Sequence, residues 1–186
     1  MKKTQENLLK AFAGESMARN KYTFYAQQAR KEGLEWIARV FEETADNERA
    51  HAEREFQFIE GEVKTLDNLA IGKIGKTLEN LKAAAAGERG EWEGMYPEFE
   101  KAAREEGEEK IADVFKEIGE VEEKHEERYL KLAEKMEKGE LFKSEDEKTE
   151  WKCLNCGYVH HGKKAPTVCP ACAKPQGFYM QEGLVQ

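Results

Sequence analysis

The chain contains one helical hairpin twice. The stretch KYTFYAQQARKEGLEWIARVFEETADNERAHAER is repeated as MYPEFEKAAREEGEEKIADVFKEIGEVEEKHEER. From Tyr22 onward, corresponding residues are 74 positions apart, so Tyr22 pairs with Tyr96, whereas the earlier pair Glu15 and Glu88 is separated by 73. Two hairpins that each bury one face are expected to pack about a pseudo-twofold axis, which brings equivalent residues together at the centre.

Apolar residues recur with a period near 3.6 through residues 4–31, 34–60, 76–106 and 108–138, which predicts four long helices. Short turns are expected at Glu32-Gly33 and Glu106-Gly107, whereas GEVKTLDNLAIGKIGKT is long enough to cross from one end of a bundle to the other. Pro97 is expected to kink or break the third helix near GMYPEF. The predicted fold is an all-α four-helix bundle over residues 1–138 with one long crossover.

Glutamates and histidines interrupt the apolar stripes of these helices. Steps of three and four along the last helix give Ile111, Phe115, Ile118, Glu122, His125, Tyr129, Leu132 and Met136. The same Glu-x-x-His spacing recurs at Glu48 and His51, and Glu15 lies on the stripe of the first helix. Burying such carboxylates without partners costs several kcal/mol each, and Arg19 is the one nearby candidate counter-charge. Bound metal ions are therefore the expected source of positive charge.

One glutamate from each of two helices, together with Glu-x-x-His from each of the other two, is the ligand pattern of dinuclear carboxylate bundles. Carboxylate oxygen and imidazole nitrogen suit iron or manganese. A single Glu-x-x-His in a glutamate-rich chain is usually a solvated helix face, but two in phase with the apolar stripes favour a metal centre. The halves differ at Glu91, whose repeat counterpart is Ala18. Glu91 is either a change of the helix surface without a function or an additional, exchangeable metal ligand.

All four cysteines lie in the C-terminal segment, as CLNC and CPAC separated by twelve residues. Two such knuckles can place four thiolates around one zinc or iron ion. Residues 139–150 are polar and aperiodic, which predicts a linker, and residues 151–186 are predicted to form the metal-binding knot. His160 and His161 are expected to be exposed, since four thiolates already complete the site.

The formal net charge of −8, with acidic and basic residues interleaved, argues against nucleic acid or anionic lipid as a partner. No apolar run has the length of a membrane span or of a signal peptide. A cytoplasmic location is the resulting expectation.

The chain resembles the rubrerythrin family over nearly its whole length, through GESMARNKY, ERAH, GERGE, EEKH and the tail motifs CLNCGY and CPAC. The resemblance implies a ferritin-like bundle with a C-terminal rubredoxin-like, zinc-ribbon-type knot. It implies a di-iron site whose ligands are Glu15, Glu48, His51, Glu88, Glu91, Glu122 and His125. Glu48 and Glu122 match the bridging carboxylates, and one iron is expected to move between His51 and Glu91 with oxidation state. Cys153, Cys156, Cys169 and Cys172 match the ligands of a mononuclear iron.

By the same resemblance, the protein is a cytoplasmic homodimer that reduces hydrogen peroxide to water. Electrons are expected from rubredoxin or an NAD(P)H-dependent flavoprotein reductase, through the four-cysteine iron. Tyr22 and Tyr96 match tyrosines beside the metal site that could hydrogen-bond its carboxylates, although core packing explains them equally well. The sequence departs from the family pattern in HHGKKAPTV between the knuckles and in Ala173 after the last cysteine, which leaves iron or zinc open for the tail.

Two other functions use the same features. A ferritin-like iron oxidase or storage protein would use the bundle without needing the tail. A zinc-ribbon adaptor on a helical stalk would hold zinc and catalyse nothing. Iron content and peroxide reactivity separate the three.

Overall fold

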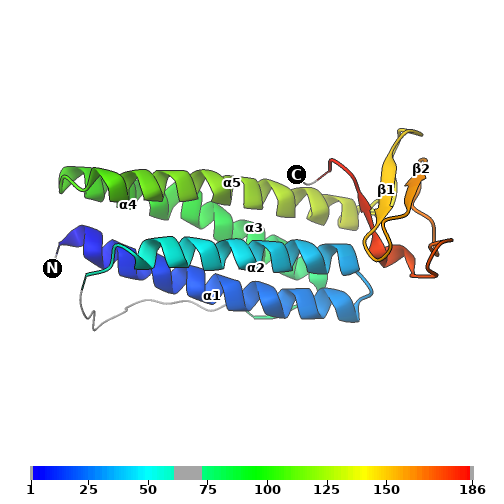
Figure 1. Ribbon diagram of the computed structural model, residues 1–186, viewed down its shortest axis with the longest axis horizontal. Helices are drawn as coiled ribbons and strands as arrows, with labels where there is room; N and C mark the ends of the chain where they lie inside the picture. Colours follow the sequence, from blue (N-terminus) through cyan, green and yellow to red (C-terminus); the bar gives the residue numbers. More distant parts are fainter. Residues whose placement is uncertain (1, 61–72, 185–186) are drawn as a thin grey trace.

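A computed structural model describes residues 2–60 and 73–184. It is an elongated four-helix bundle with a small β-rich unit at one end (Figure 1). The bundle comprises α1 (Lys3–Lys31), α2 (Glu35–Phe56), α3 (Thr77–Gly90), α4 (Tyr96–Glu105) and α5 (Glu109–Glu137), with α3 and α4 joined end to end. The pair α1 and α2 forms one hairpin, and α5 packs along α3 and α4 to form the other. The predicted bundle is confirmed, although α2 ends four residues earlier than expected.

The predicted crossover lies mostly in residues 61–72, outside the described residues. Figure 1 shows that α2 and α3 run in the same direction, as a long crossover requires.

The short turns of the two hairpins have the same geometry. The amide of Gly33 donates to the Arg30 carbonyl, and that of Leu34 donates to the Ala29 carbonyl. Gly107 and Glu108 make the equivalent bonds to Arg104 and Ala103. Both glycines have φ near +75°, a left-handed conformation that costs glycine little. Sequence repeat and backbone geometry therefore agree at both turns.

The third predicted helix is not continuous. A break near GMYPEF was expected, and the structure has one there: a π-helical turn, Glu91–Met95, separates α3 from α4. A π turn accommodates one extra residue within a helix, and the repeat offset changes from 73 at Glu88 to 74 at Tyr96. The extra residue of the second hairpin is therefore held in this turn. Pro97 follows in the first turn of α4, where its missing amide is tolerated.

Two apolar clusters fill the bundle on either side of its acidic centre. One contains Tyr22, Phe41 and Tyr129, towards the end that carries the β-rich unit. The other contains Leu8, Tyr96 and Phe115, towards the opposite end. Their alternation with polar core residues follows the interrupted stripes of the sequence.

The C-terminal unit is a three-stranded antiparallel sheet in the order β2-β1-β3. Its strands are β1 (Glu150–Cys153), β2 (Val159–His161) and β3 (Tyr179–Gln181), with a short 3-10 helix, Gln176–Phe178, before β3. Leu141, in the segment predicted as a linker, is buried against the bundle, and Phe142 contacts both the bundle and the sheet unit. This segment is therefore partly packed.

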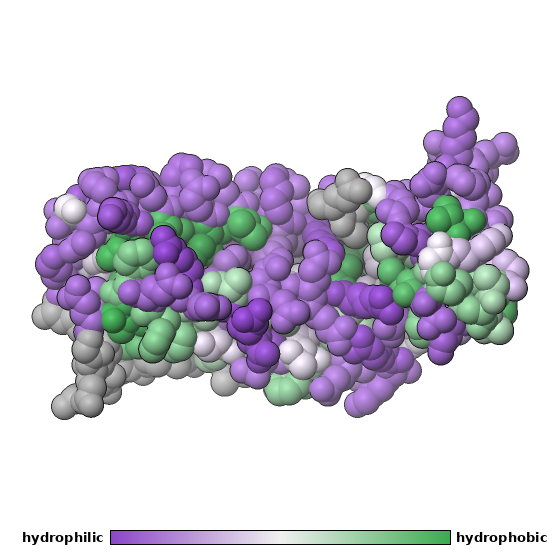
Figure 2. Space-filling view, viewed as in Figure 1, coloured by the Kyte–Doolittle hydropathy of each residue, from purple (hydrophilic) through white to green (hydrophobic). Residues whose placement is uncertain are grey.

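The surface in Figure 2 is mainly hydrophilic along the helices, with hydrophobic residues in the gaps between them and over the β-rich end. Among the described residues, no helix is both long and apolar enough to cross a membrane.

We expect Gly177→Ala to weaken the packing of the C-terminal unit on the bundle. A Cβ atom at Gly177 would lie 1.6 Å from the carbonyl oxygen of Gly33, in the α1–α2 turn. Relief of this clash requires backbone movement and should cost about 1–3 kcal/mol of unfolding free energy, measured by chemical denaturation. Gly14→Ala is the control, because a Cβ there meets nothing within 4 Å in the middle of α1. Equal stability of the Gly177 variant and the natural chain would contradict this packing.

Candidate metal centres

Four glutamates from four helices meet in the centre of the bundle. Glu15 on α1, Glu48 on α2, Glu88 on α3 and Glu122 on α5 are each no more than 1% exposed. They lie between the two apolar clusters because they replace apolar residues on otherwise continuous stripes. The rings of His51 and His125 stack in this layer with centroids 6.2 Å apart. All four carboxylates and both imidazoles thus share one buried layer.

These side chains form two overlapping ligand groups. Glu15, Glu48, His51 and Glu122 bring one ligand atom each within 4.8 Å of one another, and so do Glu48, Glu88, Glu122 and His125. Glu48 and Glu122 belong to both groups. Two neighbouring ions that share two carboxylates would therefore fit this arrangement, which supports a di-iron carboxylate site.

The imidazole Nδ1 atoms face the shared carboxylates. Nδ1 of His51 lies 2.8 Å from Glu122 Oε1 and 3.1 Å from Glu48 Oε2. Nδ1 of His125 lies 2.6 Å from Glu122 Oε2 and 3.5 Å from Glu48 Oε1. Each glutamate oxygen of this shared pair thus has an imidazole nitrogen beside it.

Among the described residues, several buried polar atoms of this layer make no well-directed hydrogen bond, although imidazole nitrogens lie close to some of them. They are Glu15 Oε2, Glu48 Oε1, Glu88 Oε2, both carboxylate oxygens of Glu122, and His125 Nδ1. Arg19, the expected counter-charge, is exposed. Leaving so many buried acceptors unsatisfied is costly, so this donor set fits bound cations with oxygen and nitrogen ligands.

The pKa values of the cluster reflect burial and mutual contact. Burial and the neighbouring Glu122 raise the pKa of Glu48 well above its usual range. Burial also raises the pKa of Glu88, to about 7. Burial alone would lower the pKa of His125, but the close carboxyl groups of Glu122 and Glu88 outweigh it and raise the value to about 9. Without metal, the cluster holds protons at neutral pH.

The two tyrosines that correspond in the repeat each contact one of the glutamates that belong to a single ligand group. The hydroxyl of Tyr22 donates to Glu88, and the hydroxyl of Tyr96 donates to Glu15. Both side chains are about 1% exposed. They therefore combine the two alternatives left open by the sequence, since each packs in an apolar cluster and also contacts a carboxylate of the cluster.

Asn47, which sequence reasoning missed, contacts only one histidine of the pair. Its side-chain amide lies 3.1 Å from His125 Nε2, on the side of the ring away from the glutamates. The repeat counterpart of Asn47 is Val121, which cannot make the equivalent bond to His51. A partner on the outer nitrogen fixes the ring orientation of a metal-binding histidine. His125 is therefore held more firmly than His51.

Glu91 lies at the edge of the cluster rather than within it. It begins the π-helical turn, is half-buried, and belongs to neither ligand group. Burial and the nearby Glu15 and Glu88 raise its pKa well above the usual range, so the protonation of Glu91 depends on the charge of the cluster.

A second acidic contact, also absent from the sequence prediction, anchors the π-helical turn to α5. Glu126, itself 5% exposed, accepts hydrogen bonds from Arg89 Nε at 2.7 Å and from Trp92 Nε1 at 2.6 Å. Arg89 and Trp92 flank Glu91 at the start of this turn. The repeat counterpart of Glu126 is Ala52, so the other hairpin has no such anchor.

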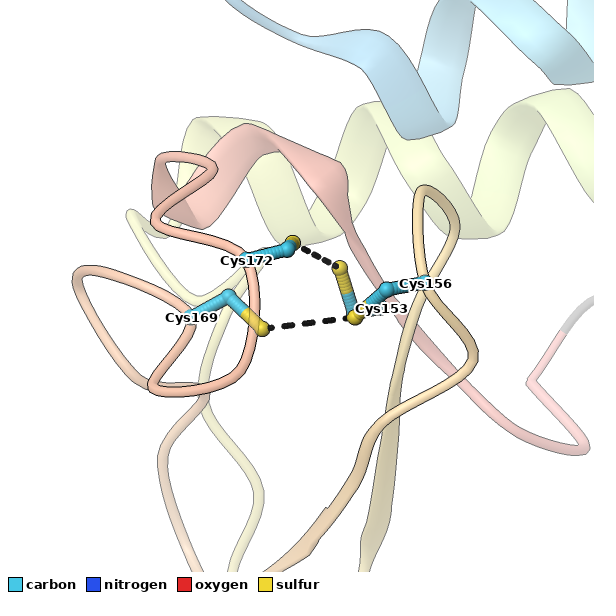
Figure 3. A group of neighbouring side chains, drawn as sticks. All are labelled: Cys153, Cys156, Cys169 and Cys172. Atoms are coloured by element: carbon cyan, nitrogen blue, oxygen red, sulfur yellow. Dashed lines mark hydrogen bonds between the residues drawn. The ribbon is translucent and has the colours of Figure 1, made fainter.

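The four cysteines converge on one point at the end of the bundle (Figure 3). Sγ of Cys153 lies 3.7 Å from Sγ of Cys172, and the same distance separates Cys156 from Cys169. These distances exclude disulfides, whose sulfurs are bonded at about 2.05 Å. A tetrahedral ion with metal–sulfur bonds of about 2.3 Å places its ligand sulfurs roughly 3.8 Å apart. The knot therefore fits one zinc or iron ion.

The two knuckles differ in the residue after the second cysteine. Gly157 takes φ of +78°, and its counterpart Ala173 takes φ of +58°. This left-handed conformation is strained for alanine, but Ala173 donates to the Cys169 carbonyl at 2.9 Å and so closes the same turn. The unusual alanine thus preserves the ligand geometry.

Comparison with known proteins identifies both parts of the chain. The Rubrerythrin family model matches residues 6–133, and the model of the rubrerythrin rubredoxin-like domain matches residues 151–179. The chain is 52% identical over 178 residues to a rubrerythrin of Porphyromonas gingivalis, covering 95% of this chain and 88% of the relative. It is 48% identical over 183 residues to a rubrerythrin of Nitratidesulfovibrio vulgaris, covering 98% and 95%.

Solved structures agree with this result. The fully reduced, all-ferrous state of nigerythrin matches with a TM-score of 0.66 and 35% identity, covering 96% of this chain and 86% of that chain. The bacterioferritin BfrA of Mycobacterium tuberculosis matches with a TM-score of 0.63 over 73% of this chain and 86% of that chain. At 21% identity, this second likeness shows the ferritin-like fold alone.

We expect metal loading of the central cluster to release protons. Metal ligands must be deprotonated, and the raised pKa values of Glu48, Glu88 and His125 mean that these groups hold protons at pH 7 without metal. Anaerobic addition of Fe(II) to metal-free protein in weak buffer should acidify the solution, and the affinity should increase with pH up to about 9. Stoichiometric binding without a pH change would contradict these protonation states.

We expect Glu126→Leu to loosen the π-helical turn. The change leaves Arg89 and Trp92 without their acceptor and should cost roughly 2–3 kcal/mol of unfolding free energy. Hydrogen exchange of the backbone amides of residues 91–96 should increase. Glu127→Leu, at the exposed neighbouring position, is the control and should change stability by less than about 0.5 kcal/mol. Unchanged exchange in the Glu126 variant would show that the anchor does not restrain the turn.

Proposed function

This chain belongs to the rubrerythrin family, and from that premise we propose that it is a peroxidase that reduces hydrogen peroxide to water. The observation that carries the proposal is the pair of overlapping ligand groups that share Glu48 and Glu122. Reduction of one H2O2 to two H2O consumes two electrons and two protons. A pair of redox-active ions matches that electron count, whereas zinc has no redox chemistry.

We assign the ligands from the two groups and from the family resemblance. Glu48 and Glu122 are the shared ligands, Glu15 and His51 complete one ion site, and Glu88 and His125 complete the other. Bound iron would supply the electron transfer to peroxide at this pair and the storage of one electron at the four cysteines. The all-ferrous state named for the nigerythrin structure supports iron as the metal.

The surrounding residues orient the ligands and keep water out. Tyr22 and Tyr96 hold Glu88 and Glu15 by hydrogen bonds, and the apolar clusters cover the layer from both ends. We propose that His51 and Glu91 are alternative ligands to one ion. Among the described residues, His51 has no partner like Asn47, and Glu91 lies at the edge of the cluster, and both observations support this exchange.

The cysteine knot is proposed to hold iron and to pass electrons to the central pair of a partner subunit. The knot packs at the α1–α2 turn, about 17 residues along α1 from Glu15, which corresponds to roughly 25 Å at 1.5 Å per residue. Electron transfer within one chain would therefore be long. A homodimer that places the knot of one chain beside the cluster of the other would shorten it, which supports dimerisation.

The remaining parts of the proposal follow from the family. We propose a ferritin-like domain over residues 1–138, a connecting segment over 139–150 and a rubredoxin-like domain over 151–186, in a cytoplasmic protein. Rubredoxin or an NAD(P)H-dependent flavoprotein reductase is the proposed electron donor.

Anaerobic stopped-flow spectroscopy of the reduced protein tests the activity. One equivalent of hydrogen peroxide should oxidise the central pair rapidly, and metal analysis should give about three irons per chain, two from the dinuclear pair and one from the knot. Faster oxidation by oxygen, with growth of an iron mineral, would favour an iron oxidase or storage protein. One zinc and little iron would favour the adaptor.

Glu91→Ala should slow peroxide-dependent oxidation about tenfold or more, since loss of a group that supports a metal ligand set typically has this effect. The absorption of the cysteine-bound iron should remain, because the knot lies at the far end of the bundle. Glu93→Ala, an exposed change within the same π-helical turn, is the control. A natural rate in the Glu91 variant would remove its proposed role.

A further inference from the structure

Glu55 is a buried carboxyl group that belongs to neither ligand group. It lies one helical turn beyond His51 on α2, and its side chain is fully buried. Its Oε1 lies 3.1 Å from the hydroxyl of Tyr96, and its Oε2 is buried without a hydrogen-bond partner. No ion pair involving Glu55 is found among the described residues. It is thus a carboxyl group without a counter-charge.

The contacts of Tyr96 determine which partner carries the proton. A phenol has a single hydrogen to donate, and the closer contact of the Tyr96 hydroxyl is with Glu15. The tyrosine oxygen must then accept a hydrogen bond from Glu55, which requires Glu55 to be a neutral carboxylic acid. The Tyr96 hydroxyl thus lies between the two carboxyl groups, and with its hydrogen directed to Glu15 a neutral Glu55 is the donor to the tyrosine oxygen.

The other hairpin has no equivalent acid. The repeat counterpart of Glu55 is Tyr129, whose ring centroid lies 5.7 Å from that of Tyr22, the tyrosine that serves Glu88. Burial raises the pKa of Tyr129 well above its ordinary value, so this phenol is a weaker proton donor than the carboxyl group of Glu55. Among the described residues, only the Glu15 side of the cluster therefore has a carboxyl group outside both ligand groups in contact with its tyrosine.

We propose that Glu55 is the proton-donating residue of this site and delivers a proton through Tyr96 to Glu15 during peroxide reduction. Resting on the proposed function, this supplies one of the two protons that each H2O2 requires. The carboxylic O–H bond of Glu55 breaks as its proton moves to the Tyr96 oxygen, the Tyr96 hydroxyl proton moves to Glu15, and Glu15 passes a proton on to a peroxide oxygen and so remains a carboxylate. Tyr96 ends neutral, Glu55 becomes a carboxylate, and no residue is oxidised.

The surroundings keep the proton on Glu55 between turnovers. The titratable groups that influence it are Glu15 on α1, Tyr96 on α4, Glu122 on α5 and His51 on its own helix. Burial and the charge of Glu15 raise the pKa of Glu55 to about 9, against the opposing charge of His51. A surface cavity of about 170 Å³ has Tyr96, Trp92 and Gly119 in its wall. It brings solvent, from which Glu55 can be reprotonated, close to the three hydrogen-bonded side chains.

Infrared spectroscopy of the full-length, metal-loaded protein tests the stored proton directly. The natural chain should show the C=O stretching band of a neutral carboxylic acid, shifted in D2O, that is missing in Glu55→Gln. Glu53→Gln, at an exposed position on the same helix, should keep the band. The presence of the same band in Glu55→Gln would overturn the assignment.

Peroxide kinetics test the delivery. We expect Glu55→Gln, which retains a hydrogen-bond donor but no acidic proton, to slow oxidation of the reduced protein by about a hundredfold. The natural chain should lose rate in the alkaline range where Glu55 loses its proton, and the variant should not. Glu53→Gln should react at the natural rate. An equal rate in Glu55→Gln would overturn the delivery role.

Two further outcomes keep the two proposals separate. If the reduced natural chain does not react with peroxide, the proposed function fails, and the infrared band alone decides whether Glu55 stores a proton. If Glu55→Gln does not fold, Tyr96→Phe breaks the chain at its middle member. It should shift the Glu55 band, because the hydrogen bond is lost, and slow oxidation to a similar degree. An unshifted band with the natural rate would overturn the relay.

Discussion

The structure depends on the neutralisation of four carboxylates inside a helical bundle. Glu15, Glu48, Glu88 and Glu122 occupy positions where leucine or phenylalanine would normally stabilise the core. Their mutual repulsion and desolvation oppose folding, so bound cations are part of the fold as well as of the chemistry. The helices, their turns and the two apolar clusters can be understood as the scaffold that holds these groups at the separation two ions require.

Duplication of one hairpin provides symmetry, and function is proposed to lie in the departures from it. The ligands Glu48 and Glu122, the histidines and the two tyrosines correspond between the halves. Asn47, Glu55, Glu91 and Glu126 have the counterparts Val121, Tyr129, Ala18 and Ala52. Each departure adds a polar group to one half only. Asn47 contacts a histidine ring, and Glu126 joins the π-helical turn to α5. Glu55 and Glu91 are additional carboxyl groups. The His125 side therefore gains a contact that orients its ring, and the His51 side gains two additional carboxyl groups, Glu55 and Glu91.

The sequence was sufficient for the helices and for the inward direction of the four central glutamates, because both follow from local spacing along one helix. The π-helical turn was not predicted, although the offset change between Glu88 and Tyr96 carried its signal. Its Trp92 donates a hydrogen bond to Glu126, which lies 34 residues further along the chain. Glu55 was visible on its stripe, but its partner Tyr96 is 41 residues away. Such pairings require the packing of the hairpins, which spacing alone does not specify.

The π-helical turn at Glu91–Met95 also makes the helices around the site, which form its walls, unequal in stiffness. Regular α-helical hydrogen bonding continues past Glu15, Glu48 and Glu122, but it is interrupted where Glu91 begins the π turn. Three walls of the bundle therefore resist deformation more than the fourth. A change in the charge of the centre would be absorbed mainly as strain at this compliant segment, leaving the remaining framework in register.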